Sequence, residues 1–313
     1  MEKHAKIFVA GHTGLVGSAT ARALKAGGYD NIIGRDASSL DLTNPSATDA
    51  FFEQERPEYV VLAAAKVGGI HANNTEPADF IRNNLQIQTN VIDACYRNGV
   101  RKLLFLGSSC IYPKHAPQPM KEEHLLSGPL EPTNDAYAIA KIAGILMCQA
   151  YNRQHKTNFI AAMPTNLYGP GDNFDLTSSH VLPAMMRKMH DAKVAGAPFV
   201  ELWGTGSPRR ELMYVEDLAR ALVFLLEKFD ATDPRDNFVN VGTGEDCTIR
   251  ELAEKVAAGV GYKGELKWNS SMPDGTPRKL LDVSRIKRLG WKPAWTLEAG
   301  IEAAYRWFLE NRA

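Results

Sequence analysis

The sequence has few cysteines and no long apolar segment. Four cysteines occur in 313 residues, and Cys95, Cys148 and Cys247 stand in no C-x-x-C motif and at no histidine spacing typical of zinc. We therefore expect these three thiols to be reduced and structural, and we expect no metal site. The chain shows no apolar signal segment at its start and no run of ~18 apolar residues. Together these absences favour a cytoplasmic protein.

The sequence also lacks an excess of charge of either sign. Thirty-six basic and thirty-six acidic side chains give a formal net charge of zero. Such a balance provides no general attraction to nucleic acid or to an anionic membrane, although a local basic pocket remains compatible with it. We expect neither partner. No internal repeat or low-complexity linker is visible, and the length allows one or two domains.

Short apolar runs alternate with helical segments in the first half of the chain. Residues 6–10, 102–107 and 159–163 are typical of buried strands, and residues 18–24 and 137–151 are typical of helices. This alternation predicts an α/β fold with a Rossmann-type doubly wound parallel sheet. From about Gly169 the pattern is irregular, and a helical pattern resumes at Glu216. We predict a dinucleotide-binding domain in residues 1–168 with a return segment near 210–242, and a smaller α/β substrate-binding lobe in residues 169–209 and 243–313.

A glycine motif lies between the first predicted strand and helix. Its G-x-x-G-x-x-G spacing is typical of short-chain dehydrogenase/reductases, although a tight turn that binds nothing has the same composition. Glycines at such a turn let the backbone approach a pyrophosphate, which the N-terminal N–H groups of the helix then stabilise. The motif consists of Gly11, His12, Thr13, Gly14, Leu15, Val16 and Gly17.

The residues after the second predicted strand, near 31–33, bear on the choice of cofactor. Arg35 can pair with the 2′-phosphate of NADPH, whereas Asp36 can accept from the free 2′-hydroxyl of NADH. We favour NADPH, but both residues are also ordinary charges for an exposed turn. Asp41 and Leu42 can reach the adenine, and small residues that end a third strand at 62–65 can lie beside the cofactor.

Three polar residues form a candidate reductase set. Ser108 follows an apolar run and is expected at the carboxyl end of a strand, where open α/β sheets bind ligands. Tyr137 and Lys141 stand four residues apart in an alanine-rich helical segment and therefore share one face. Because a neighbouring ammonium favours ionised tyrosine, Lys141 is expected to lower the pKa of Tyr137 from about 10. A Tyr-x-x-x-Lys pair alone is often a surface coincidence.

With these motifs the whole chain resembles the GDP-L-fucose synthases, a family of extended short-chain dehydrogenase/reductases. The resemblance rests on the reductase motifs and on residues 63–70, 107–113, 131–134, 164–170 and 273–279. It implies C3 and C5 epimerisation of a GDP-linked 4-keto-6-deoxy sugar, followed by reduction at C4 by NADP(H), in a homodimer. Cys110 would be the base and His180 the acid of the epimerisation.

The resemblance also implies two binding sets. Asn166, Lys188, Trp203, Arg210 and Asp274 would bind the substrate. The cofactor would contact the glycine motif, Arg35, Asp41, Leu42, Ala64, Ala65, Leu106, Gly107, Ser108, Ser109, Lys141, Pro164, Thr165, Asn166, Leu167 and His180.

Each of these residues also has an ordinary structural interpretation. Cys110 is compatible with a small buried hydrophobe, and His180 with a residue that caps or packs at a helix start. Trp203 is compatible with a core position, and Arg210 with a solvated ion pair. Three other functions remain open: a sister enzyme of a colitose or heptose pathway, a nucleotide-sugar epimerase or dehydratase that returns the hydride to its product, and a non-catalytic NADP-binding protein.

Overall fold

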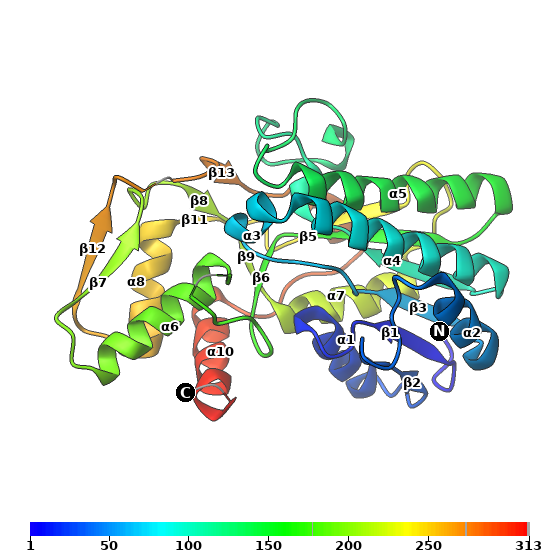
Figure 1. Cartoon of the computed structure of the whole chain (residues 1–313), viewed down its shortest axis with the longest axis horizontal. Coiled ribbons are helices and arrows are strands. Elements are labelled where there is room, and N and C mark those ends of the chain that lie inside the picture. Colours follow the sequence, from blue (N-terminus) through cyan, green and yellow to red (C-terminus); the bar gives the residue numbers. More distant parts are fainter. Residues whose placement is uncertain (177, 273, 312–313) are drawn as a thin grey trace.

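A six-stranded parallel sheet forms the centre of the molecule (Figure 1). The computed structural model describes residues 1–176, 178–272 and 274–311. The strand order is β10-β5-β4-β3-β1-β2, and every neighbouring pair is parallel. The strands are β1 (Ile7–Ala10), β2 (Ile32–Ile33), β3 (Tyr59–Leu62), β4 (Lys102–Leu106), β5 (Phe159–Pro164) and β10 (Phe238–Val241).

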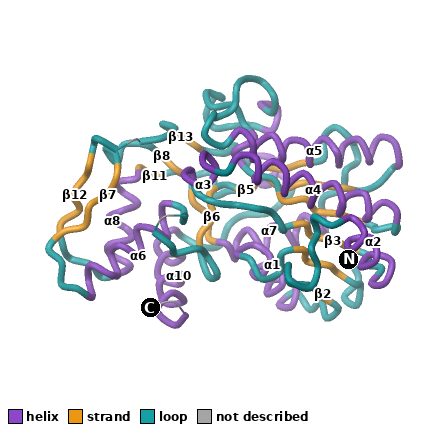
Figure 2. The backbone as a smooth tube through the Cα atoms, viewed as in Figure 1, coloured by secondary structure: helices purple, strands orange, loops and turns teal. Residues whose placement is uncertain are grey.

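Helices cover both faces of this sheet, because side chains of a strand alternate between its faces. In β1, Ile7 and Val9 pack with Leu24 of α1, whereas Phe8 and Ala10 belong to the cluster on the opposite face. One layer contains α1 (Leu15–Ala26) and α7 (Val215–Lys228), and the other contains α2 (Pro45–Glu55), α4 (Pro77–Arg97) and α5 (Asp135–His155) (Figure 2). This arrangement confirms the predicted doubly wound α/β fold.

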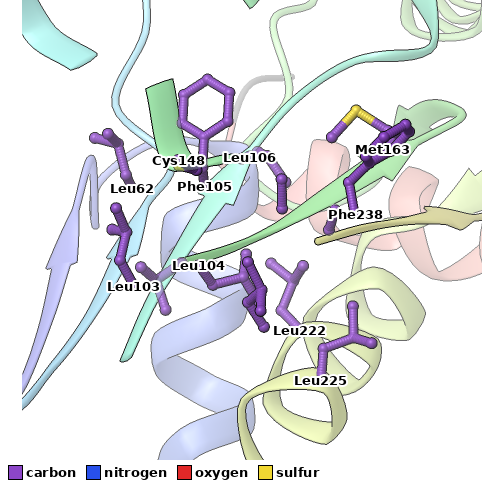
Figure 3. Close-up of a cluster of buried hydrophobic side chains, with 14 of the residues drawn as sticks. Leu62, Leu103, Leu104, Phe105, Leu106, Cys148, Met163, Leu222, Leu225 and Phe238 are labelled. Carbon is purple, nitrogen blue, oxygen red and sulfur yellow. The ribbon is translucent and has the colours of Figure 1, made fainter. Parts of the chain in front are cut away.

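The main core is built around β4. Figure 3 shows Phe105 beside Cys148 on one side of the strand, and Leu222 and Leu225 of α7 on the other. These side chains are 0–1% exposed. Burying a large apolar side chain contributes roughly 1.5–3 kcal/mol, so β4 is a rigid support for the residues that follow it.

A second core lies at the far end of the molecule. It joins α6 (Val181–Val194), α8 (Ile249–Val260) and α10 (Leu297–Asn311) to the parallel pair of β7 (Phe199–Trp203) and β12 (Glu265–Asn269) (Figure 1). A helix start at His180 was only an alternative interpretation of the sequence, and no helix was predicted over the range of α6. Pro183 obscured it in the sequence, although proline is tolerated in the first turn of a helix, where its missing N–H costs no hydrogen bond.

Small sheets and short helices connect the two cores. Strand β8 pairs with β13 and β11, and β6 pairs with β9. The fully buried Glu211, just after β8, accepts from the N–H groups of Gly244 at 2.7 Å and Leu281 at 2.9 Å, so three distant segments meet there. These elements are β6 (Asn166–Tyr168), β8 (Arg209–Arg210), β9 (Leu212–Tyr214), β11 (Cys247–Thr248), β13 (Arg278–Lys279), α3 (Ile70–Thr75), α9 (Ser284–Arg288), and the 3-10 helices η1 (Ser109–Ile111) and η2 (Glu122–His124).

Helix α7 and strand β10 both contribute to the main core, although they follow β7 and β8 in the chain. The exact boundaries of the two domains remain a prediction. None of the helices in the described ranges has the length and apolar character that a membrane span requires.

Candidate active site

The glycine motif forms a tight turn between β1 and α1. Gly11 has φ +83°, and a Cβ on Gly17 would lie 2.0 Å from the Gly11 carbonyl oxygen, so neither position suits a larger residue. Gly14 caps α1 without a side chain, which leaves the first N–H groups of the helix available to an anion. The turn therefore fits the pyrophosphate of a dinucleotide.

This turn lies where the strand order reverses. From β1 the chain continues to β2 on one side and then to β3 on the other, and open α/β sheets bind ligands at such a point. Strand β3 ends at Leu62, earlier than predicted, so Ala64 and Ala65 follow it in a loop. A Cβ on Gly11 would approach the Ala64 nitrogen to 2.8 Å, which shows how closely this loop meets the turn.

The candidate residues for the adenosine end already have partners within the chain. The Arg35 guanidinium pairs with Glu55 at 2.7 Å, and His12 lies 3.7 Å from Asp36. Asp41 accepts from the backbone and hydroxyl of Thr43, which lowers the pKa of its carboxyl group. The Leu42 side chain lies in the main core. Arg35 and Asp36 both lie on the exposed turn, so cofactor choice between them stays a prediction.

The remaining cofactor candidates lie at the carboxyl ends of β4 and β5. Leu106 ends β4, and Gly107 donates its N–H to Ala162 of β5 at 2.9 Å. Thr165 and Asn166 both donate side-chain hydrogen bonds to the Glu211 carbonyl, at 3.2 and 2.9 Å. Three further members of the set lie nearby: Ser109 in η1, Pro164 at the end of β5, and Leu167 in β6.

Ser108, Tyr137 and Lys141 lie together beyond the end of β4. The Ser108 hydroxyl accepts from the Cys110 N–H at 3.2 Å and also interacts with Tyr137. Lys141 is buried, donates to the Leu106 carbonyl at 2.8 Å, and has its nitrogen 5.8 Å from the centroid of the Tyr137 ring. The helix α5 thus presents both residues to the end of β4.

The expected pKa of Tyr137 is wrong for this structure. Burial and the nearby Cys110 raise the pKa of Tyr137, and its interaction with Ser108 offsets them only in part. Burial also lowers the pKa of Lys141 to about 7. Because the apolar surroundings disfavour the lysine charge itself, Lys141 does not lower the tyrosine pKa as the spacing suggested.

Cys110 has a different environment from the other cysteines. Burial raises the pKa of its thiol, but the charge of Lys279 and hydrogen bonds from Ser108, Lys279 and Asn134 outweigh burial, so the pKa is lowered. By contrast, burial raises the pKa of Cys95 and of Cys148. All four cysteines are free, and among the described residues no group of three His, Cys, Asp or Glu side chains can hold a metal ion.

His180 occupies the N-cap position of α6, but its side chain makes no capping hydrogen bond. The loop before it is tied to the loop after β3, because Gly69 donates to the Ser178 carbonyl at 3.2 Å. Surrounding protein and the charge of Lys279 lower the pKa of the imidazole. Lys279 therefore acts on both members of the candidate acid/base pair.

The candidate substrate residues gather around β7, β8 and the segment at 274–279. Trp203 is 60% exposed, which excludes a core position, and the Lys188 nitrogen lies 5.6 Å from the centroid of its ring. Both Asp274 oxygens accept from Thr205, at 2.7 and 2.8 Å. Arg210 is half-buried and feels the charge of Asp274. Asn166, in β6, donates to the carbonyl of Glu211, the residue that follows Arg210.

Two residues of this site were not predicted from the sequence. Lys279 donates to the Cys110 sulfur at 3.4 Å, and Asn134 donates to it at 3.3 Å. Lys279 lies 169 positions from Cys110, so no local spacing connects them. Asn134 occupies the N-cap position of α5 without a side-chain capping hydrogen bond. The available signal for both residues was that they lie in segments 131–134 and 273–279, which carry the family resemblance.

Comparison with known proteins gives the family. Residues 7–242 match the NAD dependent epimerase/dehydratase family. GDP-L-fucose synthase 1 of Arabidopsis thaliana is 59% identical over 310 residues, which cover 99% of this chain and 95% of that protein. GDP-L-fucose synthase of Escherichia coli K12 is 53% identical over 312 residues, covering 98% and 97%.

A solved structure agrees with these relatives. The GDP-mannoheptose C4 reductase MlghC of Campylobacter jejuni, with NADP bound, superposes with a TM-score of 0.92 at 40% identity and covers 99% of both chains. The chain belongs to the NAD dependent epimerase/dehydratase family, and the predicted resemblance to GDP-L-fucose synthases is confirmed.

Proposed function

We propose that this chain converts GDP-4-keto-6-deoxy-D-mannose into GDP-L-fucose. It inverts C3 and C5 of the sugar and then reduces C4 with NADPH. The observation that carries the proposal is the Cys110 thiol, whose pKa is lowered, beside the Ser108, Tyr137 and Lys141 set. The full-length relatives named GDP-L-fucose synthase support the same substrate.

The epimerisation uses Cys110 and His180. The C4 ketone acidifies the hydrogens on C3 and C5, because each carbanion is delocalised as an enolate. The Cys110 thiolate takes the proton and becomes a thiol, while the electron pair moves to the carbonyl oxygen. His180, when protonated, returns a proton to the opposite face and becomes neutral imidazole. Exchange with solvent then restores both groups for the second carbon.

The reduction uses Ser108 and Tyr137. Ser108 donates a hydrogen bond to the C4 oxygen, and Tyr137 gives that oxygen its proton. The raised pKa of Tyr137 keeps its hydroxyl protonated at neutral pH and ready to donate. NADPH supplies the hydride when bound. The glycine turn suits its pyrophosphate, and Arg35 would turn from Glu55 toward its 2′-phosphate.

The GDP part of the substrate would occupy the region around β7 and β8. Trp203 offers an exposed aromatic face, Lys188 and Arg210 offer positive charge to the diphosphate, and Asp274 offers a hydroxyl acceptor. The two cores support a division into a cofactor domain and a substrate lobe. A homodimer formed through α4 and α5, and a cytoplasmic location, complete the proposal, and the four free thiols are consistent with that location.

A sister reaction on another GDP-4-keto sugar is the second candidate. The relationship to a GDP-mannoheptose C4 reductase favours it, because that fold is nearly the same over the full chain. In a colitose or heptose pathway fewer or different carbons would be inverted before the reduction.

NADPH oxidation with GDP-4-keto-6-deoxy-D-mannose in deuterated buffer tests the proposal. NMR of the product should show GDP-L-fucose with deuterium at C3 and C5. NADPH consumption with a different sugar product would move the chain to a sister pathway. Product formed without NADPH consumption would favour a simple epimerase, and NADPH binding without turnover of any keto sugar would favour a non-catalytic protein.

A further inference from the structure

The Cys110 sulfur is enclosed by two donors from distant segments. Lys279 approaches it at 3.4 Å from β13, and Asn134 at 3.3 Å from the N-terminus of α5. The Lys279 backbone is fixed by pairing with Arg210 of β8, and its carbonyl accepts from the Glu211 N–H at 3.2 Å. The small sheet of β8 and β13, held by the buried Glu211, therefore positions the Lys279 ammonium group beside the sulfur.

We propose that Lys279 is a positioning residue that holds the Cys110 sulfur as a thiolate, with Asn134 as the second donor. The inference rests on the proposed function of Cys110 as the base. An ammonium group and the amide nitrogen of asparagine both donate hydrogen bonds and cannot accept them. Both hydrogen bonds are stronger to a thiolate than to a neutral thiol, because the acceptor is then charged. Together they favour the charged form of the sulfur.

In the described part of the chain, the charge of Lys279 is not neutralised by a carboxylate, whereas the neighbouring cations are paired. Arg278 pairs with Asp246 at 2.5 Å, and Lys114 pairs with Glu131 at 3.0 Å. Among the described residues, Lys279 forms no ion pair with a carboxylate within 4.0 Å. Its positive charge therefore acts on the sulfur without a local counter-ion.

Other ionisable groups face the same region and contribute to its titration. Tyr137 of α5 lies near the Cys110 sulfur, and His180, at the start of α6, lies near Lys279. Lys114, Glu131 and Arg278 line the small pocket beside Cys110. Because Lys114 and Glu131 neutralise each other and Arg278 is paired with Asp246, Lys279 is the dominant charge on the thiol.

The test is the pH dependence of Cys110 alkylation in the unliganded protein. Iodoacetamide labelling is followed between pH 5 and pH 10 by the mass of the Cys110 peptide, with Cys110→Ser as the background. Lys279→Met should move the labelling midpoint upward by about one pH unit or more. Arg278→Met removes a neighbouring charge that does not contact the sulfur, and it should leave the midpoint in place. Lys279→Arg should keep it low, because guanidinium stays charged throughout.

An unchanged midpoint in Lys279→Met overturns the inference, as does an equal shift in Arg278→Met. If circular dichroism shows that the Met variant is unfolded, Lys279→Gln takes its place with the same expectation. The measurement needs no sugar, so it separates the two proposals. A shifted midpoint in a protein that turns over no GDP-keto sugar supports the role of Lys279 and contradicts the proposed reaction. Deuterium-labelled GDP-L-fucose from the wild type, with an unshifted labelling midpoint in Lys279→Met, supports the proposed reaction and contradicts the role of Lys279.

Discussion

The two proton-transfer groups of this site lie close together, but their electrostatic surroundings differ. Around Tyr137 and Lys141, burial dominates, and both residues are driven toward their neutral forms. Around Cys110, the charge of Lys279 and three hydrogen bonds overcome burial, and the charged sulfur is favoured. A proton donor for a ketone oxygen should hold its proton, and a carbon base should not. The comparison shows that the charge of Lys279, together with hydrogen bonds to the sulfur, separates the protonation of Cys110 from that of Tyr137.

Replacing Cys110 with serine should remove most of the epimerase activity. The hydroxyl keeps the contacts to Lys279 and Asn134 but is a far weaker base, so exchange at C3 and C5 should fall by about 10²- to 10⁴-fold. Solvent deuterium incorporation measured by NMR provides the readout, and NADPH binding should be retained. Undiminished labelling at both carbons would exclude Cys110 as the base.

Replacing Tyr137 with phenylalanine should remove most of the reductase activity. Loss of the hydroxyl should slow NADPH oxidation by about 10²-fold or more, while deuterium exchange at carbon continues. The two rates are measured in one deuterated reaction by absorbance and NMR. If reduction survives in this variant, the proton comes from another group.

Lys141→Met should change how stability depends on pH. The folded-state pKa of about 7 lies below the unfolded value near 10.4, so the unfolded chain binds more protons between these values, and stability rises with pH there. The wild type is thus penalised most below pH 7. The Met variant lacks this penalty and should gain about 3 kcal/mol more, relative to wild type, at pH 6 than at pH 9. Urea unfolding at both pH values measures the difference. Equal differences at the two pH values would show that Lys141 titrates normally.

Trp203→Ala should have the smallest effect and should leave both proton-transfer groups alone. Loss of an aromatic contact of about 1 kcal/mol should raise KM for the GDP-sugar about fivefold with little change in kcat. Phe199→Ala is the matched control, because Phe199 lies on the same exposed face of β7 and is 45% exposed. A similar rise in KM for both variants would assign the effect to β7 as a whole rather than to stacking on Trp203.

Much of the fold was predictable because the signals are local. The first strand, the glycine turn and the helix after it follow from about twenty consecutive residues, and the Tyr137 and Lys141 pair follows from one helical turn. The helix start at His180 was considered only as an alternative, because Pro183 and the stretch with glycine and proline before it resemble a loop. The early end of β3 was missed because alanine is compatible with either a strand or a loop.

The parallel sheet, the glycine turn and the family could all be predicted from the amino-acid sequence. The sheet and the turn depend on neighbouring residues, and the family is identified from short motifs along the whole chain. The contact between Lys279 and Cys110, which are 169 positions apart, and the burial that lowers the pKa of Lys141 both arise from the folded arrangement of distant segments. The reason is physical. Strand and helix formation depend on neighbouring residues, whereas the protonation of a side chain depends on the charges and the water that the folded chain places around it.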